Sequence, residues 1–285
     1  MPASRWHCPA GGCAWMMGVL NCTPNSFSDG GRYIDVNAAV RHGLDMWQAD
    51  AAIIDVGGES TRPGSVPVSQ AEELDRVIPV VKALAAEGVY ISIDTSKAEV
   101  MRQAILAGAQ MVNDVTALRG DEASLGIVAD SGVDVCLMHM QGTPETMQNQ
   151  PQYTDVLSEV MAFFEQRIDA CLKSGIRESA IALDPGIGFG KRLEDNLALL
   201  TRLPGLKELG FPLLVGISRK SFLGDVSGAG VDDREIETAA AVAIATYSGA
   251  DVLRVHDIDR QKRAIKVASA MRSSDCVLKE SPDHV

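Results

Sequence analysis

Val89-Tyr90-Ile91-Ser92-Ile93-Asp94 is one of eight stretches in this sequence in which a short apolar run leads into a polar or charged residue. A continuous apolar run of this length is typical of a strand buried on both faces, as in a parallel sheet covered by helices. Eight such strands alternating with helices predict an α/β fold of the (β/α)8 type, the TIM barrel, whose active site lies at the carboxyl ends of the strands. The polar residues expected at that mouth are Asn21, Asp55, Asp94, Asn113, His139, Asp184, Ser218 and His256.

Segments with helical periodicity separate the apolar runs. The sequence predicts helices over 37–49, 69–84, 97–106, 153–174 and 235–248, of which 153–174 is the longest. Ser69 and Glu72 have the spacing of a capping box, whereas Pro79 is expected to kink or interrupt the same helix. Ser96 is expected to cap the next helix, and Gly108 is expected to end it.

Composition limits the partners that this chain can have. The 285 residues carry 46% hydrophobic side chains and a formal net charge of −12, with a pI near 4.9. A strongly acidic protein has no general attraction for nucleic acid or for an anionic membrane surface. No stretch approaches the roughly 20 apolar residues of a membrane-spanning helix, and the N-terminus does not resemble a signal peptide. We therefore expect a cytoplasmic protein.

The length suits a single domain, since α/β barrels commonly reach roughly 250 residues. No linker or repeat divides the chain, so we expect one barrel over 14–272. A disordered segment over 1–13 and a frayed tail over 273–285 are expected to flank it. Among six cysteines, Cys136 lies inside an apolar run and is expected to be a reduced, buried thiol.

Two of the loops expected at the mouth are rich in residues suited to ligand binding. The first, 21–31, is dense in Pro, Gly, Ser and Asn, so its Phe27 either closes over a ligand or packs on the barrel rim. The second, 55–65, combines a glycine pair, hydroxyl groups and Arg62. Arginine presents a planar fork of donors to phosphate oxygens, although a tight surface turn with a solvated arginine also fits this loop.

Basic residues gather at the ends of the last two strands. Arg254 and His256 share one face of the eighth strand because side chains alternate along a strand. Together with Arg62 and Lys220 they predict a phosphate-sized cationic site, at the loops where barrels commonly bind phosphate. No acidic pair has the spacing of a dedicated metal cage, so any Mg²⁺ is expected to arrive with substrate phosphates.

Carboxylates and amides end the other strands. Asp94, Asn113 and Asp184 can accept from and donate to a heterocycle with an amino-amide edge. Each Asp can instead cap the turn after its strand; we favour that role for Asp55, as support for its loop, and ligand contact for Asp94 and Asp184. The segment 184–191 fails the spacing of a P-loop and is interpreted as a flexible loop carrying Phe189 over the mouth.

Motifs along the whole predicted barrel resemble those of the dihydropteroate synthase family. The matching stretches are Asn-x-Thr-Pro-x-Ser-Phe-Ser-Asp-Gly-Gly (21–31), Asp-Val-Gly-Gly-Glu-Ser-Thr-Arg-Pro-Gly (55–64), Ile-Asp-Thr-Ser-Lys (93–97), Asn-Asp (113–114), Met-His-Met-Gln-Gly (138–142), Asp-Pro-Gly-x-Gly-Phe-Gly-Lys (184–191), Ser-Arg-Lys-Ser (218–221) and Arg-Val-His-Asp (254–257). The resemblance implies condensation of hydroxymethyl-dihydropterin diphosphate with para-aminobenzoate, giving dihydropteroate and pyrophosphate in folate synthesis. It also implies Mg²⁺ as cofactor, a homodimer and a sulfonamide target.

The same resemblance implies a role for each matching residue. The pterin ring is held by Asp94, Asn113, Asp184 and Lys220, with Met138 and Gly216 lining its slot. The diphosphate is held by Thr61, Arg62, Arg254 and His256, while Asn21 coordinates Mg²⁺. The aminobenzoate pocket consists of Phe27, Pro63, Phe189, Lys220 and Ser221. The residues implied to act in catalysis are Asp29, Lys220, Arg254 and His256.

Chemistry agrees with these roles, because an aromatic amine is a weak nucleophile and the leaving group must be strongly stabilised. We expect a largely dissociative displacement without a covalent enzyme intermediate. The chain departs from the family at Asn25, where Asp is usual, and at Cys22. Two other functions stay open: the pterin-binding barrel of a corrinoid-linked methyltransferase, which needs no diphosphate site, and a non-catalytic homologue that binds the pterin diphosphate without releasing pyrophosphate.

Overall fold

Eight parallel strands close into a barrel in this computed structural model, which describes residues 13–23, 35–61 and 64–280. The strands are β1 (Trp15–Asn21), β2 (Ile53–Gly57), β3 (Ile91–Asp94), β4 (Met111–Asp114), β5 (Asp134–Met138), β6 (Ile181–Asp184), β7 (Leu214–Gly216) and β8 (Val252–Val255). Their order in the sheet is β6-β5-β4-β3-β2-β1-β8-β7. A parallel bridge between Leu183 and Leu213 joins β6 to the segment before β7 and so closes the ring. The expected (β/α)8 fold is confirmed.

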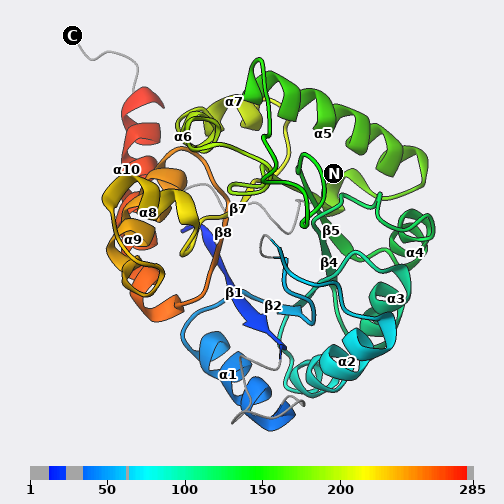
Figure 1. Cartoon of the computed structure of the whole chain (residues 1–285). Helices are drawn as coiled ribbons and strands as arrows, with labels where there is room; N and C mark the ends of the chain where they lie inside the picture. Colours follow the sequence, from blue (N-terminus) through cyan, green and yellow to red (C-terminus); the bar gives the residue numbers. More distant parts are fainter. Residues whose placement is uncertain (1–12, 24–34, 62–63, 281–285) are drawn as a thin grey trace.

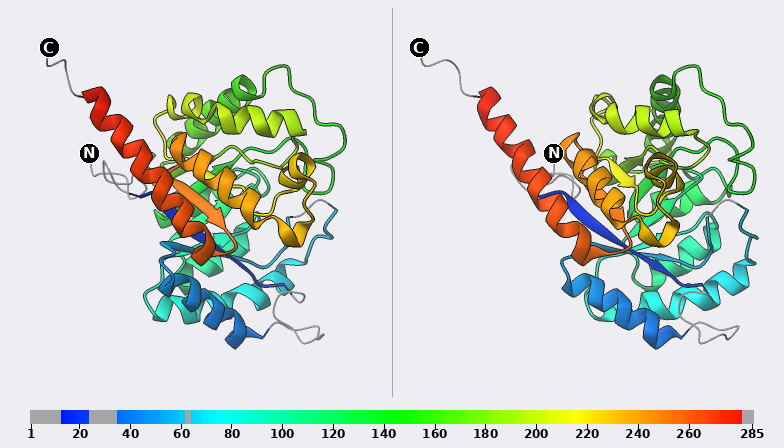
Figure 2. Two further views of the ribbon diagram at one scale, coloured as in Figure 1. Left: turned by 90° about the vertical axis from the view of Figure 1, so that its left-hand side faces the viewer. Right: turned by 60° about the vertical axis from the view of Figure 1, so that its left-hand side comes forward.

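Helices surround the barrel (Figure 1). They are α1 (Val36–Gln48), α2 (Gln70–Ala86), α3 (Ala98–Ala107), α4 (Ser124–Ser131), α5 (Val156–Lys173), α6 (Leu193–Thr201), α7 (Leu203–Lys207), α8 (Ser221–Ser227), α9 (Glu235–Tyr247) and α10 (Ile258–Glu280), with 3₁₀ turns η1 (Glu178–Ala180) and η2 (Val231–Asp233). Figure 2 shows α9 and α10 side by side on one flank of the barrel. None of the described helices is long and apolar enough to cross a membrane.

Two expected helix signals are confirmed by the backbone. The Ser69 hydroxyl accepts from the amide of Glu72 at 3.2 Å and caps α2. Gly108, with φ of 115°, ends α3 in the left-handed conformation that glycine adopts without steric cost.

Three details of the predicted helices are wrong. Of the two outcomes expected at Pro79, a kink or an interruption, the interruption is wrong: Pro79 lies inside α2, because the buried face around it, which includes Val77 and Val80, holds the helix against the barrel. Ser96 does not cap α3, since Lys97 precedes its first residue and the Lys97 amide bonds to the Thr95 hydroxyl. The longest helix is α10 rather than α5, because α10 continues beyond 273, where the sequence predicted a frayed tail.

The barrel interior is built in layers along the strands. One layer is apolar and consists of Met17, Ile53, Met111, Cys136, Ala182, Leu214 and Val252. Inward-facing positions recur every second residue, so the next layer toward the carboxyl ends starts two residues further on. It contains Asp55, Asn113, Met138, Asp184, Gly216 and Arg254. The apolar layer therefore forms the floor of a polar site, and Cys136 is the free, buried cysteine that was expected there.

Candidate active site

A buried network of charged groups fills the polar layer, with Arg254 at its centre. Nε of Arg254 lies 2.6 Å from Oδ2 of Asp55, and Nη2 lies 2.7 Å from Oδ2 of Asp94. Asn113 donates from Nδ2 to the same Asp55 oxygen at 3.1 Å. The expected role of Asp55 as a cap for its own loop is therefore wrong. Its side chain is fully buried and points into the barrel, where it holds Arg254 and Asn113.

Burial dominates the electrostatics of this network. It raises the pKa of Asp94 to about 7, although the charge of Arg254 opposes the shift, and it raises the pKa of Asp184 to about 6. Burial and the neighbouring Arg254 charge lower the pKa of Lys220 to about 8. Burial alone would lower the pKa of Arg254, but Asp55 and Asp94 outweigh it and raise that pKa. Asp94, Asp184 and Lys220 can therefore gain or lose protons near neutral pH, whereas Arg254 keeps its charge.

An apolar wall with a cation above it borders the network. Nζ of Lys220 lies 3.9 Å from the centroid of the Phe189 ring, in cation–π geometry. Phe189 packs against a cluster that includes Met138 and Met140. Gly216 lies opposite Arg254 in the β7–β8 register, and its lack of a side chain leaves space beside the aliphatic part of the Arg254 side chain. The structure thus brings Met138, Phe189, Gly216 and Lys220 to the same end of the barrel, as the sequence predicts.

The loop that carries Phe189 is firmly held, which corrects the expectation of a flexible segment. Nζ of Lys191 donates to the backbone oxygens of Gly186 at 2.9 Å, Phe189 at 3.0 Å and His139 at 3.2 Å. The same atom lies 3.0 Å from Nδ1 of His139. Burial lowers the pKa of Lys191 to about 7. One buried amine therefore fastens the loop after β6 to the end of β5.

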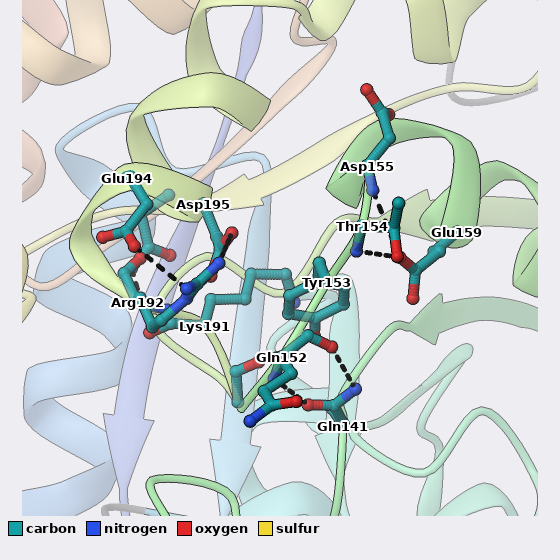
Figure 3. A network of polar contacts seen from close by, with 12 residues as sticks. Gln141, Gln152, Tyr153, Thr154, Asp155, Glu159, Lys191, Arg192, Glu194 and Asp195 are labelled. Atoms are coloured by element: carbon teal, nitrogen blue, oxygen red, sulfur yellow. Dashed lines mark hydrogen bonds and ion pairs between the residues drawn. The ribbon is translucent and has the colours of Figure 1, made fainter. Parts of the chain in front are cut away.

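Further bonds tie this loop to the segment before α5 (Figure 3). The Tyr153 hydroxyl donates to the oxygen of Gly190 at 2.7 Å. Gln141 and Gln152 are joined by two hydrogen bonds, of 3.0 and 2.9 Å, between the Gln141 side chain and the Gln152 backbone. Gly190 is required here, since a Cβ at that position would lie 2.4 Å from the oxygen of Gln141. The two loops form one rigid rim on the Phe189 side of the mouth.

His256 follows β8, two strands along from the strand that precedes the Phe189 loop, and contacts Ser218. Nδ1 of His256 lies 3.0 Å from the Ser218 hydroxyl, which also accepts from the His256 amide at 3.4 Å. His256, Asn21 and Arg219 line a cavity of about 690 Å³ that extends toward α1 and the start of α10. This cavity is separate from the Arg254 network, because none of the network residues lines it.

The expected diphosphate cluster is only partly assembled. Arg254 is paired with carboxylates rather than turned toward His256. Thr61 is half-buried in the loop after β2, and Ser221 is exposed at the start of α8. Asn25, Phe27, Asp29, Arg62 and Pro63 lie outside the described residues.

A second buried ion-pair network, not anticipated from the sequence, supports the loop after β2. Nζ of Lys97 contacts the carboxylates of Glu59 and Glu73, the latter at 2.5 Å. Glu73 is fully buried on α2, and Arg76 of the same helix donates to the oxygen of Gly58 at 2.7 Å. The sequence feature that could have indicated this network is the Ile-Asp-Thr-Ser-Lys motif (93–97), because its lysine, Lys97, follows the polar end of a predicted strand.

Asn21, which the resemblance implies as a ligand of Mg²⁺, lines the same cavity as His256. No group of three His, Cys, Asp or Glu side chains capable of holding a metal ion occurs among the described residues. Mg²⁺ commonly keeps several waters and binds through one or two protein oxygens together with substrate phosphates. The amide oxygen of Asn21, beside His256 at the cavity, fits an ion of that kind.

The fold and these contacts define a barrel enzyme with a deep, charged ligand site at the carboxyl ends of its strands. A sequence family described as pterin binding enzyme matches residues 17–256. The chain is 47% identical to the dihydropteroate synthase of Escherichia coli (strain K12) over 260 residues, which cover 91% of this chain and 92% of that protein. It is 46% identical to the enzyme of the same name from Synechocystis sp. over 259 residues, 90% of each chain.

Solved structures agree with these relatives. The dihydropteroate synthase of Yersinia pestis, in complex with a sulfonamide drug, superposes with a TM-score of 0.87 at 45% identity, covering 92% of this chain and 95% of that one. The enzyme of Xanthomonas albilineans, solved with 4-aminobenzoic acid, gives 0.84 at 44% identity, covering 95% and 94%. The chain therefore belongs to the dihydropteroate synthase family of pterin-binding enzymes. The resemblance seen in the motifs is confirmed.

Proposed function

We propose that this chain condenses 6-hydroxymethyl-7,8-dihydropterin diphosphate with para-aminobenzoate, giving dihydropteroate and pyrophosphate. The observation that carries the proposal is the buried donor and acceptor set of Asp94, Asn113 and Asp184, closed on one side by Lys220. Structures of the Xanthomonas albilineans relative were solved with 4-aminobenzoic acid and with 7,8-dihydropteroate. These are one substrate and the product of the proposed reaction.

The pterin ring fits the polar layer by hydrogen-bond chemistry. Its amino-amide edge presents donors to carboxylates and an acceptor to an amide or ammonium group. Asp94 and Asp184 supply the acceptors, while Asn113 and Lys220 supply donors. Met138 and Gly216 are proposed to line the slot for the ring, above the apolar layer. Buried polar groups that find partners only in the correct ring give strong discrimination between ligands.

The diphosphate belongs at the His256 side of the mouth. Thr61, Arg62, Arg254 and His256 are proposed to hold it, and the Ser218 contact orients the His256 ring. Asn21 would hold Mg²⁺ there together with the phosphate oxygens, and the ion supplies charge stabilisation for the departing diphosphate. These cationic groups are needed because the protein as a whole is acidic.

The aminobenzoate is proposed to lie between Phe27, Pro63, Phe189, Lys220 and Ser221. Of these, Phe189 and Lys220 are already in contact, and Ser221 opens α8 next to Lys220. The fixed loop around Lys191 keeps the Phe189 ring in place, so one wall of this pocket is formed before the amine binds.

The reaction is proposed to begin with cleavage of the bond between the pterin methylene carbon and the diphosphate oxygen. The electron pair leaves with the diphosphate, toward His256 and the arginines, and the pterin delocalises the positive charge left on the methylene. The amine nitrogen then forms a bond to that carbon and releases its proton to solvent water. Asp29 is proposed to stabilise positive charge near the amine. Phe189 and the apolar cluster behind it exclude water from the pterin cation, because water would otherwise react with the cation in place of the amine.

A homodimer is part of this proposal. Exposed apolar side chains occur on the two neighbouring helices α9 and α10, namely Ile236, Ile244, Tyr247, Val267 and Met271. Exposed apolar groups gathered on adjoining helices favour association with a second apolar surface. Sedimentation of Val267→Glu should show monomer where the unaltered chain shows dimer; a monomeric unaltered chain would contradict this part. A cytoplasmic location is proposed as well, in keeping with the free, buried Cys22, Cys136 and Cys171.

Residue variants test the assignment of the two ends of the substrate. Asp184→Asn should weaken binding of the pterin ring itself, measured by calorimetry with 6-hydroxymethylpterin. His256→Gln should leave that affinity within about threefold and reduce binding of the diphosphate ester by about tenfold or more, the scale of one charge-assisted hydrogen bond. Equal losses of both ligands in both variants would contradict the assignment. Removal of Mg²⁺ by a chelator should abolish turnover but preserve binding of the ring.

A further inference from the structure

Arg219 lies in a backbone conformation that is unusual for its residue type, between two residues of the site. Its φ is 59°, in the left-handed region that non-glycine residues seldom adopt. Such residues persist only where the surroundings fix them, and they gather at functional sites. On one side Ser218 contacts the His256 ring, and on the other Lys220 contacts Phe189. The conformation of Arg219 therefore determines where two contacts of the site fall.

Helix α9 holds this conformation from outside the barrel. Nε and Nη2 of Arg219 lie 2.8 and 2.7 Å from Oε1 of Glu235. The Arg219 amide donates to the Thr238 hydroxyl at 3.2 Å. The second oxygen of Glu235 accepts from Nε2 of Gln261, on α10, at 3.2 Å. Thr238 and Gln261 are fully buried, so this clamp is anchored in the packed layer between helices and strands.

We propose that Arg219 is a positioning residue, held by Glu235, that fixes Ser218 and Lys220 and through Ser218 orients His256. The inference rests on the proposed function, in which His256 holds the diphosphate and Lys220 holds the pterin and the amine. Ser218 contacts one ring nitrogen of His256, so the orientation of that histidine depends on the place of the serine. A hydrogen-bonded partner of this kind sets which nitrogen faces the ligand.

Direct contact of Arg219 with the diphosphate is the competing role, because Arg219 lines the same cavity as Asn21 and His256. The backbone separates the two roles. Glycine adopts a φ of 59° without steric cost, whereas alanine does not. Arg219→Gly therefore removes the guanidinium but tolerates the turn, while Arg219→Ala removes the guanidinium and leaves the turn strained.

The experiment compares Arg219→Ala, Arg219→Gly, Glu235→Ala and the double variant Arg219→Ala/Glu235→Ala in the full chain. We expect kcat/KM for the pterin diphosphate to fall about 10- to 100-fold in Arg219→Ala and in Glu235→Ala, the scale of a small misplacement of reacting groups. Arg219→Gly should be at least about threefold more active than Arg219→Ala. The double variant should be no worse than Arg219→Ala, because the pair acts as one unit. The inhibition constant of pyrophosphate should rise most in the variants that lose the most activity.

Arg102→Ala is the matched control, since it removes an arginine held by two bonds to Glu99 on the outside of α3. It should leave activity unchanged. Melting temperatures distinguish a positioning effect from a loss of fold. Activities are compared only among variants that have similar melting temperatures. Equal losses in Arg219→Gly and Arg219→Ala, with Glu235→Ala active, would assign direct contact and overturn the proposal. Activity within twofold in all variants would also overturn it.

Failure of the proposed function would be visible separately, as an unaltered chain that releases no pyrophosphate in the presence of the amine. Calorimetry with inorganic pyrophosphate and Mg²⁺ then tests the positioning role by itself. The same order of affinities among the variants is expected. Absence of pyrophosphate binding to the unaltered chain, or a different order, would overturn the proposal.

Discussion

Nη2 of Arg254 lies 2.7 Å from Oδ2 of Asp94, so a cation assigned to the diphosphate is paired with a carboxylate assigned to the pterin ring. The same guanidinium is held by Asp55 through Nε. A pterin that bonds to Oδ2 of Asp94 competes with Nη2 for that oxygen, while the diphosphate offers the guanidinium new acceptors. The two ends of one substrate are thereby coupled through a single side chain.

Arg254→Met tests this coupling. Without the competing guanidinium, affinity for 6-hydroxymethylpterin should stay within about threefold of its original value or rise. Affinity for the diphosphate ester should fall by about tenfold or more, as expected for the loss of a charge-assisted bond. Calorimetry with both ligands measures the difference, and Arg102→Met on the outer face of α3 serves as control. Parallel losses for the two ligands would show that Arg254 does not distinguish them.

Asp55→Asn should weaken the fold as well as the site. The fully buried carboxylate accepts from both Arg254 and Asn113, so its neutral replacement loses charge-assisted bonding worth about 2 kcal/mol of unfolding free energy. Urea unfolding measures the loss. Asp169→Asn, which breaks an exposed pair with Lys173 on α5, should change stability by no more than about 0.5 kcal/mol. Equal stabilities of the two variants would contradict the assigned role of Asp55.

Lys97→Met should be strongly destabilising. It leaves the fully buried Glu73 without its cation, and breaking a buried pair in this way costs about 3–5 kcal/mol. The double variant Lys97→Met/Glu73→Gln should recover part of that loss, because no buried charge is left unpaired. Chemical unfolding of both variants gives the comparison, with the exposed Lys173→Met as control. A double variant less stable than Lys97→Met would contradict this explanation.

His139 should make stability depend on pH. Burial, together with the charges of Lys191 and Arg119, lowers its pKa from 6.5 to about 3. Below pH 6.5 the unfolded chain therefore binds a proton that the folded chain does not, so this residue's contribution to stability is lost as pH falls. His139→Asn keeps an acceptor for Lys191 but does not titrate.

The difference in unfolding free energy between the unaltered chain and His139→Asn should change as pH falls from 6.5 to 5, with a slope that approaches about 1.4 kcal/mol per pH unit at the lower end. The comparison is made below pH 6.5 because Lys191, which contacts position 139, itself has a pKa of about 7. The carboxylates with raised pKa are present in both proteins and largely cancel in the difference. A difference that does not vary with pH would mean that His139 is protonated in the folded chain.

The barrel and most of the mouth were predictable from the sequence, because a strand buried on both faces is an unbroken apolar run and its end is marked by a polar residue. The same periodicity located Arg254 and His256 on one face. The partners of these residues were not predictable. Asp55 was interpreted as a loop cap because only its neighbours in the chain were known, whereas its contacts come from β4 and β8.

Contacts that depend on distant segments account for the other errors. The loop with Phe189 is rich in glycine, which indicated mobility, but Lys191 fastens it through three backbone oxygens. The helix at Pro79 continues because its apolar face is packed on the barrel. In each case tertiary contacts outweigh a local preference.

The condensation itself is tested by measuring pyrophosphate release from the purified chain with Mg²⁺ and pterin diphosphate, in the presence and absence of para-aminobenzoate. We expect release that requires the amine and equals the dihydropteroate formed, with no pterin attached to the protein. Tight binding of the pterin diphosphate without amine-dependent release, or a covalent adduct trapped during turnover, would contradict the proposed reaction.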